Sequence, residues 1–297
     1  MSAGAQSLRA RVDAPAARRL TRLRRIDRIG LLITIGTLAL AILWAFPLYW
    51  AIITTFKHEY ETVRPGLRLW PEEFTFENYA QVLTHTKIGI WYINSLITST
   101  AVTVLVIIMA AGAGYAISQL EFPGRRFFWW MILASFMVPI PALIVTHYIV
   151  LSQLKLINTL TGVVGPQLIA PVTVIIYKQF FDSVPKDFRE AAVIDGANDW
   201  QLLFRIYLPM NWGITTALAI ITFIGAWNLF LWPFLAVSSE DKMNITVGIT
   251  QVHDAFGVHY ARDLAVAMLA ALPVAVVYLL FQRRVTQAIM LSAGIKG

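Results

Sequence analysis

The chain has 297 residues, of which 58% are hydrophobic and only 14% are charged, and its mean hydropathy is +0.64. Because soluble domains carry about 25% charged residues, this composition argues against a soluble fold. The absence of cysteine excludes disulfides, thiolate metal sites and cysteine nucleophiles. The net charge of +7 lies in the tails and in loops beside apolar segments, as membrane topology requires, and does not indicate nucleic-acid binding.

Six apolar stretches follow one another along the chain, at residues 29–55, 89–118, 127–151, 162–177, 212–237 and 264–281. A membrane-spanning helix needs about 20 apolar residues, and the fourth stretch, which contains Pro166 and Pro171, is the shortest. The stretches are continuous rather than alternating, which predicts helices and argues against a barrel. The sequence therefore predicts an all-α membrane protein with six transmembrane helices in residues 29–281, between tails at 1–28 and 282–297.

The distribution of positive charge predicts which way the helices face. Six spans place both termini on one side, and 17 of the 24 Lys and Arg residues lie on that side, eight of them in residues 1–28. By the positive-inside rule, both termini and the loop at residues 179–211 are predicted to be cytoplasmic. The Arg-rich tail is predicted to be disordered. The first helix is predicted to stay uncleaved, because no small-residue cleavage site follows it.

A polar insert of about 30 residues separates the fourth and fifth stretches. Ser183 is predicted to cap its first helix, whose first turn holds Pro185 and Asp187. Gly196 is predicted to end that helix, because glycine readily takes positive φ. One face of this helix carries Phe188, Ala191, Ala192 and Asp195, and the alanines leave that face open to close approach.

A second helix at residues 200–208 is predicted to begin at a cap on Asp199 and to end at Pro209. Two short helices joined at a glycine predict a compact protrusion that touches a soluble partner. The alternative is an amphipathic helix lying on the headgroups. The acids Asp187, Glu190 and Asp195 argue against that alternative, because anionic lipid would repel them.

Small and polar residues within the spans suggest further roles. Ala110, Gly114 and Ser118 form a small-residue stripe that permits close helix contact, either as a sliding surface or as static packing. The prolines at 139, 141, 166 and 171 are candidate kinks. Asn228 and Trp227 are the candidate cavity-lining residues, the alternative being an interhelical hydrogen bond or an interfacial tryptophan. His147 is predicted near a membrane face.

The loops between the spans carry their own signals. Residues 74–79 are predicted to begin a short surface helix, and Pro123-Gly124 to form a turn. The polar loop at 238–263 holds His253 and His259, for which no metal site is expected.

Glu190-Ala191-Ala192, Gly196, and Ile206 with Leu208-Pro209 share the spacing Glu-Ala-Ala, three residues, Gly, nine residues, Ile-x-Leu-Pro. This motif resembles the signature of permease subunits of binding-protein-dependent ABC importers. Other segments are similar to the carbohydrate branch of that family, which includes the inner-membrane permease of the maltose transporter. These segments are Phe46-Pro47-Leu48-Tyr49-Trp50, Asn94-Ser95, Phe122-Pro123-Gly124-Arg125-Arg126, Gly225-Ala226-Trp227-Asn228, Trp232-Pro233 and Gly294-Ile295-Lys296-Gly297.

The resemblance implies a type I ABC importer permease in a bacterial inner membrane that moves a sugar or related solute into the cytoplasm. Glu190, Ala191, Ala192, Asp195 and Gly196 would couple it to the ATPase. The tail residues Gly294, Ile295, Lys296 and Gly297 would also approach the ATPase. The implied partners are a second permease subunit, a dimer of cytoplasmic ATPase subunits, an extracytoplasmic solute-binding protein and lipid.

The chain is not expected to be an enzyme. It has no G-x-x-x-x-G-K-[ST] loop, so no cofactor is expected in it, and ATP and Mg would be bound by the partner ATPase. An ion-coupled secondary transporter is the main alternative, although such proteins carry ionisable residues near the bilayer midplane and none is evident here. A membrane enzyme is a further alternative, but the chain has no H-E-x-x-H or G-x-S-x-G motif.

Overall fold

The computed structural model describes the backbone of residues 28–66, 68–252 and 258–292, and side chains over residues 29–66, 68–252 and 258–282. Every regular element in these ranges is helical. The N-terminal tail up to residue 27, His253, and the tail residues Gly294–Gly297 lie outside the described residues.

Three long helices are apolar enough to cross a membrane as single spans: α2 (Arg28–Thr54), α5 (Ile88–Gln119) and α16 (Tyr260–Ser292). Each is long enough to cross the hydrocarbon core of a bilayer, and because a helix bonds its own backbone polar groups, lipid can surround its apolar side chains. α16 runs past residue 281, where the sequence predicted the last span to end, so part of the expected C-terminal tail is helical.

Bent helix pairs account for the other predicted spans. α6 (Arg125–Phe136) meets η1 (Ile140–Leu143) and α7 (Ile144–Gln153) at 98°. α8 (Leu160–Val164) and η2 (Gly165–Leu168) meet α9 (Pro171–Asp182) at 48°. The breaks coincide with the candidate prolines, because proline lacks the backbone N–H and restricts the residue before it. The described residues thus give three spans made of one helix each, and up to six spans when each bent pair is counted as one.

The fifth predicted span, at residues 212–237, is interrupted. α13 (Trp212–Asn228) ends at Leu229, and α14 (Leu231–Ala236) follows as a separate short helix. The second half of the insert precedes α13 in the chain and meets it at 86°. It consists of α11 (Asp199–Leu202), η3 (Leu203–Tyr207) and α12 (Leu208–Met210). The prediction of one continuous span here was therefore wrong.

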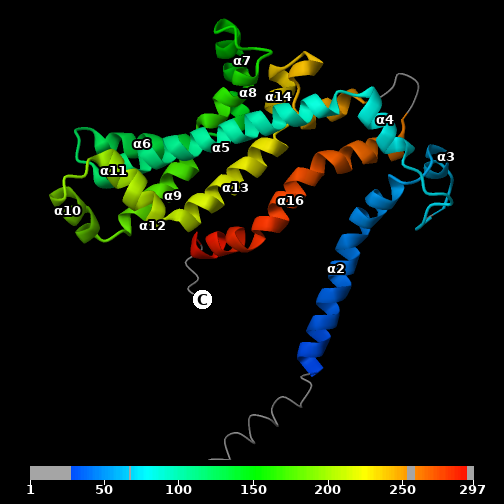
Figure 1. Cartoon of the computed structure of the whole chain (residues 1–297), viewed down its shortest axis with the longest axis horizontal. Coiled ribbons are helices and arrows are strands. Elements are labelled where there is room, and N and C mark those ends of the chain that lie inside the picture. Colours follow the sequence, from blue (N-terminus) through cyan, green and yellow to red (C-terminus); the bar gives the residue numbers. More distant parts are fainter. Residues whose placement is uncertain (1–27, 67, 253–257, 293–297) are drawn as a thin grey trace, which may run out of the picture.

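The long helix α5 organises the bundle (Figure 1). α9 and α13 pack along α5, and α16 packs against α13. α2 projects away from this bundle and touches it near its own C-terminal end. The insert helix α10 (Lys186–Ile194) lies at one end of the molecule, whereas α3 (Glu59–Thr62) and α4 (Glu77–His85) lie at the other. α4 confirms the short helix that the sequence predicted after residue 74.

Glycine permits the close packing of α5 on α9. A Cβ on Gly114 would lie 2.8 Å from the Tyr177 Cβ and 3.1 Å from the Lys178 backbone nitrogen. Ser118, one turn further along, donates a hydrogen bond to Asp182 Oδ1 at 2.6 Å. The predicted small-residue stripe is thus a contact surface. Past it, Gly124 takes φ +85° in the predicted turn between α5 and α6.

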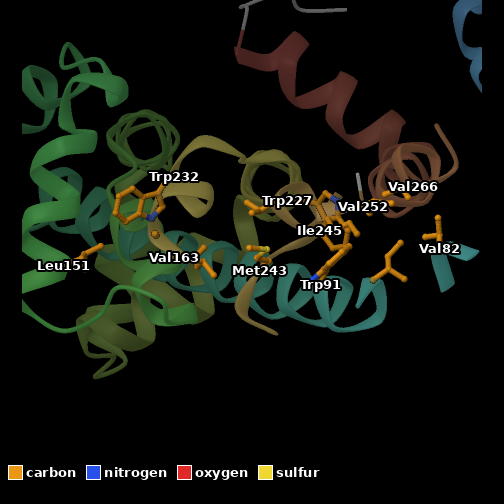
Figure 2. Packing of buried hydrophobic residues seen from close by; sticks show 14 residues of the cluster. Val82, Trp91, Leu151, Val163, Trp227, Trp232, Met243, Ile245, Val252 and Val266 are labelled. Carbon is orange, nitrogen blue, oxygen red and sulfur yellow. The ribbon is translucent and has the colours of Figure 1, made fainter. Parts of the chain in front are cut away.

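One buried cluster joins the far end of α5 to the segment after α14 (Figure 2). It contains Trp91, Trp227, Trp232, Met243 and Ile245 among its members. The Trp91 indole donates to the Glu240 carbonyl at 3.0 Å, and a Cβ on Gly248 would lie 2.1 Å from the Trp91 ring. The elements η4 (Glu240–Lys242) and α15 (Ile245–Gly248) therefore pack on α5, and η5 (Ile249–Gln251) packs on α16.

Polar contacts fix this segment further. Asn94 Nδ2 donates to the carbonyls of Asp241 and Met243 at 2.9 and 2.8 Å. The Lys87 ammonium lies 3.2 and 3.0 Å from carboxylate oxygens of Glu240 and Asp241. Hydrogen bonds to Asp241 and Glu240 raise the pKa of Lys87, although the exposed position limits their contribution to stability.

Candidate functional site

The candidate site is the insert, residues 183–211, whose first helix is α10. α10 begins at Lys186 after Pro185, with Asp187 in its first turn, as the sequence predicted. The predicted cap on Ser183 was wrong. Ser183 instead follows the last residue of α9, and its hydroxyl donates back to the Phe180 carbonyl at 2.6 Å.

The end of α10 is held by a Schellman motif. Gly196 has φ +81°. Its N–H donates to the Val193 carbonyl at 3.0 Å, and the Ala197 N–H donates to the Ala192 carbonyl at 2.9 Å. These are the two bonds by which a residue of positive φ closes a helix C-terminus. The prediction that Gly196 ends the helix is confirmed.

A capping box starts the second half of the insert. The Gln201 N–H donates to Asn198 Oδ1 at 2.9 Å, and the Asn198 N–H donates to Gln201 Oε1 at 3.0 Å. The cap is therefore Asn198. The prediction that Asp199 caps this helix was wrong. Both helix ends are therefore satisfied by hydrogen bonds within residues 192–201, which fix the course of the turn between them.

A π-helix continues this second half. The Leu208 N–H donates to the Leu203 carbonyl, five residues back, and η3 is the resulting wide turn. The sequence predicted that the helix ends at Pro209. That prediction was wrong, because α12 runs on to Met210.

Buried aromatic rings form the base of the insert, where it meets α5 and α9. Tyr207 is fully buried and stands edge-to-face with Tyr115 at 5.2 Å and with Phe181 at 5.6 Å between ring centroids. Tyr177 stacks on Phe181 at 5.3 Å. Offset and edge-to-face pairs of this kind add to the burial of apolar area. Burial also raises the pKa of Tyr207, an effect that Arg189 partly opposes.

Side-chain hydrogen bonds tie the same surfaces together. The Tyr115 hydroxyl donates to Asp199 Oδ1 at 2.9 Å, and the Tyr207 hydroxyl donates to Gln119 Oε1 at 2.7 Å. Gln119 Nε2 in turn donates to the Phe181 carbonyl at 3.2 Å. Tyr115, Gln119 and Tyr207 were not predicted from the sequence. No local spacing signals these contacts, since the first two pairs lie 84 and 88 residues apart in the chain.

The tip of the insert is apolar and exposed. Ile194 has 86% of its surface exposed and Trp200 has 69%. Trp200 stacks on the exposed Phe204 with 6.1 Å between ring centroids, and Phe188 and Val193 are also exposed. Exposed apolar side chains on an otherwise polar segment are typical of a site of protein contact.

The predicted coupling residues all lie in this insert, in α10 and the turn that follows it. Glu190, Ala191, Asp195 and Gly196 are exposed, whereas Ala192 is half-buried and packs against the aromatic base. The insert therefore has a base bonded to α5, a turn closed by its own hydrogen bonds, and exposed apolar side chains. Within the described ranges, no three His, Asp or Glu side chains gather as a metal site.

A second feature is a cavity of about 680 Å³ between α6, α7, η2, α13 and α14. Its wall is mostly apolar, and His147, Gln167 and Trp232 are among its residues. The His147 ring stands edge-to-face on Trp232 at 5.8 Å, and Gln167 Nε2 donates to the Val163 carbonyl at 2.9 Å.

The two residues predicted to line a cavity lie elsewhere. Trp227 is 2% exposed, and its indole donates to the Ala270 carbonyl at 3.2 Å, so it lies in the interior rather than on the cavity wall. It is an interhelical hydrogen bond, which was one of the alternatives to a place on a cavity wall. Asn228 is exposed at the last residue of α13.

These features define a multi-pass helical membrane protein with a structured insert at one end. Residues 107–289 match the family described as binding-protein-dependent transport system inner membrane component, and the chain belongs to this family. The family and the fold class predicted from the sequence are confirmed.

Individual relatives cover most of the chain. It is 30% identical over 269 residues to the arabinooligosaccharides transport system permease protein AraQ of Halalkalibacterium halodurans, covering 90% of this chain and 96% of that protein. It is 34% identical to the diacetylchitobiose uptake system permease protein NgcG of Streptomyces coelicolor, over 84% of this chain and 85% of that protein. It is 32% identical to the sn-glycerol-3-phosphate transport system permease protein UgpE of Brucella abortus, over 82% of this chain and 89% of that protein.

The fold is also found in a solved structure. A chain from the crystal structure of a bacterial ABC transporter involved in the import of the acidic polysaccharide alginate superposes with a TM-score of 0.77. That match covers 87% of this chain and 97% of the other at 23% identity, which establishes a common fold.

Proposed function

We propose that this chain is the transmembrane permease subunit of an ATP-driven importer that moves a sugar or related solute into the cytoplasm. It works with a second, homologous permease, a dimer of cytoplasmic ATPase subunits and an extracytoplasmic solute-binding protein. The solute class is supported by the relatives, which are named for arabinooligosaccharides, diacetylchitobiose and sn-glycerol-3-phosphate.

The observation that carries the coupling role is the exposed apolar tip of the insert on its rigid base. The ATPase subunit would receive Ile194 and the stacked Trp200 and Phe204 in a cleft. Glu190 and Gly196 are among the exposed residues of the family motif. Because the base is bonded to α5 and packed on α9, a push on the tip moves these two helices with it.

The orientation of the chain in the membrane follows from the contact between the insert and the ATPase. The insert lies in the cytoplasm with both termini, in agreement with the bias of Lys and Arg along the sequence. α3, α4 and the segment at residues 240–252 then lie outside the cell, where the solute-binding protein docks. The tail residues 294–297 lie on the ATPase side.

Transport is proposed to follow a two-state gate. Closure of the ATPase dimer draws the inserts of the two permeases together, the helices rock, and the solute path opens outward. Hydrolysis resets the gate, and each ligand shifts the balance only by its preference for one state. The helices bend at the prolines, and the cavity beside His147 and Gln167 leaves them room to move between the two states. Asn228 at the end of α13 faces the path shared with the second permease.

Crosslinking tests the coupling role directly, since the chain has no cysteine of its own. Ile194→Cys carrying a short crosslinker captures the ATPase subunit in membranes that contain the assembled importer. Leu83→Cys on α4, which is 61% exposed, is the matched control and captures no ATPase. Failure of Ile194→Cys to capture a nucleotide-hydrolysing subunit, or capture at Leu83, contradicts the proposed site and orientation.

Gly196→Asp tests the coupling function. Nothing lies within 4 Å of a Cβ at Gly196, and Asp tolerates positive φ better than most residues, so the chain folds and inserts. The new carboxylate lies at the tip and uncouples ATP hydrolysis from uptake. Gly124→Asp is the control, because Gly124 also has positive φ and its Cβ would meet only the Phe128 ring, at 3.7 Å. Equal uptake in both variants contradicts the coupling role.

A further inference from the structure

A second cavity, of about 210 Å³, lies at the end of the molecule opposite the insert. Its walls come from the last turn of α2, the loop that follows, and the first turn of α16. Trp50, Lys57, Glu61, Arg64, Arg68 and Tyr260 are among its lining residues. Its volume is far larger than the ~10–15 Å³ that a single water needs.

The cavity is built by specific contacts between distant parts of the chain. The Glu59 carboxylate accepts hydrogen bonds from the Tyr260 and Ala261 N–H groups at 2.7 and 3.0 Å, which fixes the loop on the start of α16. Asn78 Nδ2 donates to the carbonyls of Thr55 and Lys57 at 2.9 and 2.8 Å. These bonds hold the walls in place without any occupant.

Lys57 is a buried cation without an acidic partner. The residue is 2% exposed, and its ammonium donates to the Arg68 carbonyl at 2.6 Å and lies 4.4 Å from the Trp50 ring centroid. Among the described residues, no carboxylate lies within ion-pairing distance of it. Burial lowers the pKa of Lys57, whereas the field of Glu61 opposes that shift.

Glu61 is a buried acid with one oxygen unused. The residue is 3% exposed, and its Oε2 accepts the Glu72 N–H at 2.9 Å. Its Oε1 is buried and has no partner in the described part of the chain. A buried polar atom without a partner is costly, so an occupant that donates to it is favoured.

The two arginines of the cavity are already matched. Arg64 lies 3.1 Å from Glu72 Oε2, and Arg68 also pairs with Glu72. The groups that still need a partner are therefore one cation, Lys57, and one anion, Glu61. A zwitterion satisfies both groups with opposite charges, which a neutral occupant does not supply.

The position of the cavity indicates where such a zwitterion comes from. Trp50 and Tyr260 lie at the ends of two membrane-spanning helices, α2 and α16. The adjoining loop exposes Trp70, Phe74 and Phe76. Aromatic side chains gather at the level of the lipid headgroups, which places the cavity in that layer.

We propose that this cavity binds the headgroup of an amine-bearing zwitterionic phospholipid, phosphatidylethanolamine, with its phosphate at Lys57 and its ammonium at Glu61 Oε1. A primary ammonium donates three hydrogen bonds, whereas the quaternary ammonium of phosphatidylcholine donates none. Free phosphoethanolamine carries the same two charges, but it lacks the acyl chains that would lie along α2 and α16.

Native mass spectrometry of the purified full chain tests this with unmodified protein. Phosphatidylethanolamine, its mono- and dimethylated forms and phosphatidylcholine are offered at equal concentrations. Retention falls along this series and is at least about tenfold lower for phosphatidylcholine, because one charge-assisted hydrogen bond is lost. Equal retention across the series overturns the proposal. Free phosphoethanolamine competes weakly, and competition as strong as that of the lipid would assign the cavity to a soluble zwitterion instead.

Substitutions at Glu61 and Lys57 test which side chain binds each charge of the headgroup. Glu61→Gln keeps an acceptor for the Glu72 N–H and abolishes the preference over phosphatidylcholine, whereas Glu73→Gln, whose side chain is 80% exposed in the same loop, does not. Lys57→Met keeps the apolar stem on Trp50 and weakens retention of every phospholipid in the series. Lys242→Met, at an exposed position, is its control. A Glu61→Gln protein that keeps the headgroup preference refutes the assignment.

Discussion

The contact between α5 and α9 at Gly114 makes a prediction that two matched alanine substitutions can test. A Cβ at 114 would lie 2.8 Å from the Tyr177 Cβ, 3.1 Å from the Lys178 nitrogen and 3.3 Å from the Val174 carbonyl oxygen. Two of these neighbours are backbone atoms and cannot swing aside. Gly114→Ala therefore forces the two helices apart. Gly112→Ala, on the same helix, meets nothing within 4 Å.

The magnitude follows from two opposing terms. Overpacking a tight interior contact costs about 1–3 kcal/mol, and replacing glycine by alanine within a helix returns roughly 0.5–1 kcal/mol. The second term is common to both variants, so it cancels in the comparison and leaves the full overpacking cost. At about 2–4 °C per kcal/mol, Gly114→Ala is expected to melt roughly 2–12 °C below Gly112→Ala.

The assay is thermal unfolding of the purified protein in one detergent, followed by the fluorescence of its ten tryptophans. Equal melting temperatures for the two variants would show that α5 and α9 do not approach as closely as described. A higher melting temperature for Gly114→Ala would refute the overpacking argument altogether. Since α9 leads into the insert, the same variant also lowers coupled uptake.

Three further predictions concern the ends of the bundle. Glu59→Gln removes the charge that caps α16 and lowers the free energy of unfolding by about 0.5–2 kcal/mol, measured by thermal melting, while the exposed Glu73→Gln leaves it unchanged. Asn94→Leu leaves the carbonyls of Asp241 and Met243 unpaired and costs about 1–3 kcal/mol, an effect that Asn228→Leu at an exposed position does not share. Deleting residues 1–24 leaves solute uptake intact, because this Arg-rich segment has little potential to form a core and lies outside the segments that resemble the family; lost uptake with normal insertion would contradict this.

Much of the fold could be predicted because its signals are local. The apolar lengths gave the spans, the prolines gave the positions of the breaks, and the motif around Gly196 gave the insert. The bend angles of 98° and 48° could not be predicted, since they depend on what packs against each half. The interruption after Asn228 does have a signal, because Pro233 cannot donate a helical bond to the Leu229 carbonyl four residues before it, but this proline was not among the candidate kinks.

The candidate site could be predicted at its tip and not at its base. The motif identifies residues 190–196 through spacing along one helix. The base depends on Tyr115, Gln119 and Tyr207, which meet only after α5 and the insert have packed. The two incorrect caps have a common cause, because Ser183 and Asp199 each had a competitor. The Ser183 hydroxyl bonds back to the helix that precedes it, and Asn198 stands three residues before Gln201, which is the spacing of a capping box.

The π-turn at Leu203–Tyr207 sets the phase between the two ends of the insert. One residue of an α-helix corresponds to a rotation of about 100°, and a π-turn accommodates one extra residue without breaking the helix. Removing a single residue from this stretch would leave the length nearly unchanged but would rotate Trp200 and Asp199 relative to Pro209. Asp199 accepts from the Tyr115 hydroxyl and Tyr207 donates to Gln119, so this rotation would pull at least one of the two side chains away from its partner on α5. The extra residue of the π-turn is therefore what lets both bonds form at once.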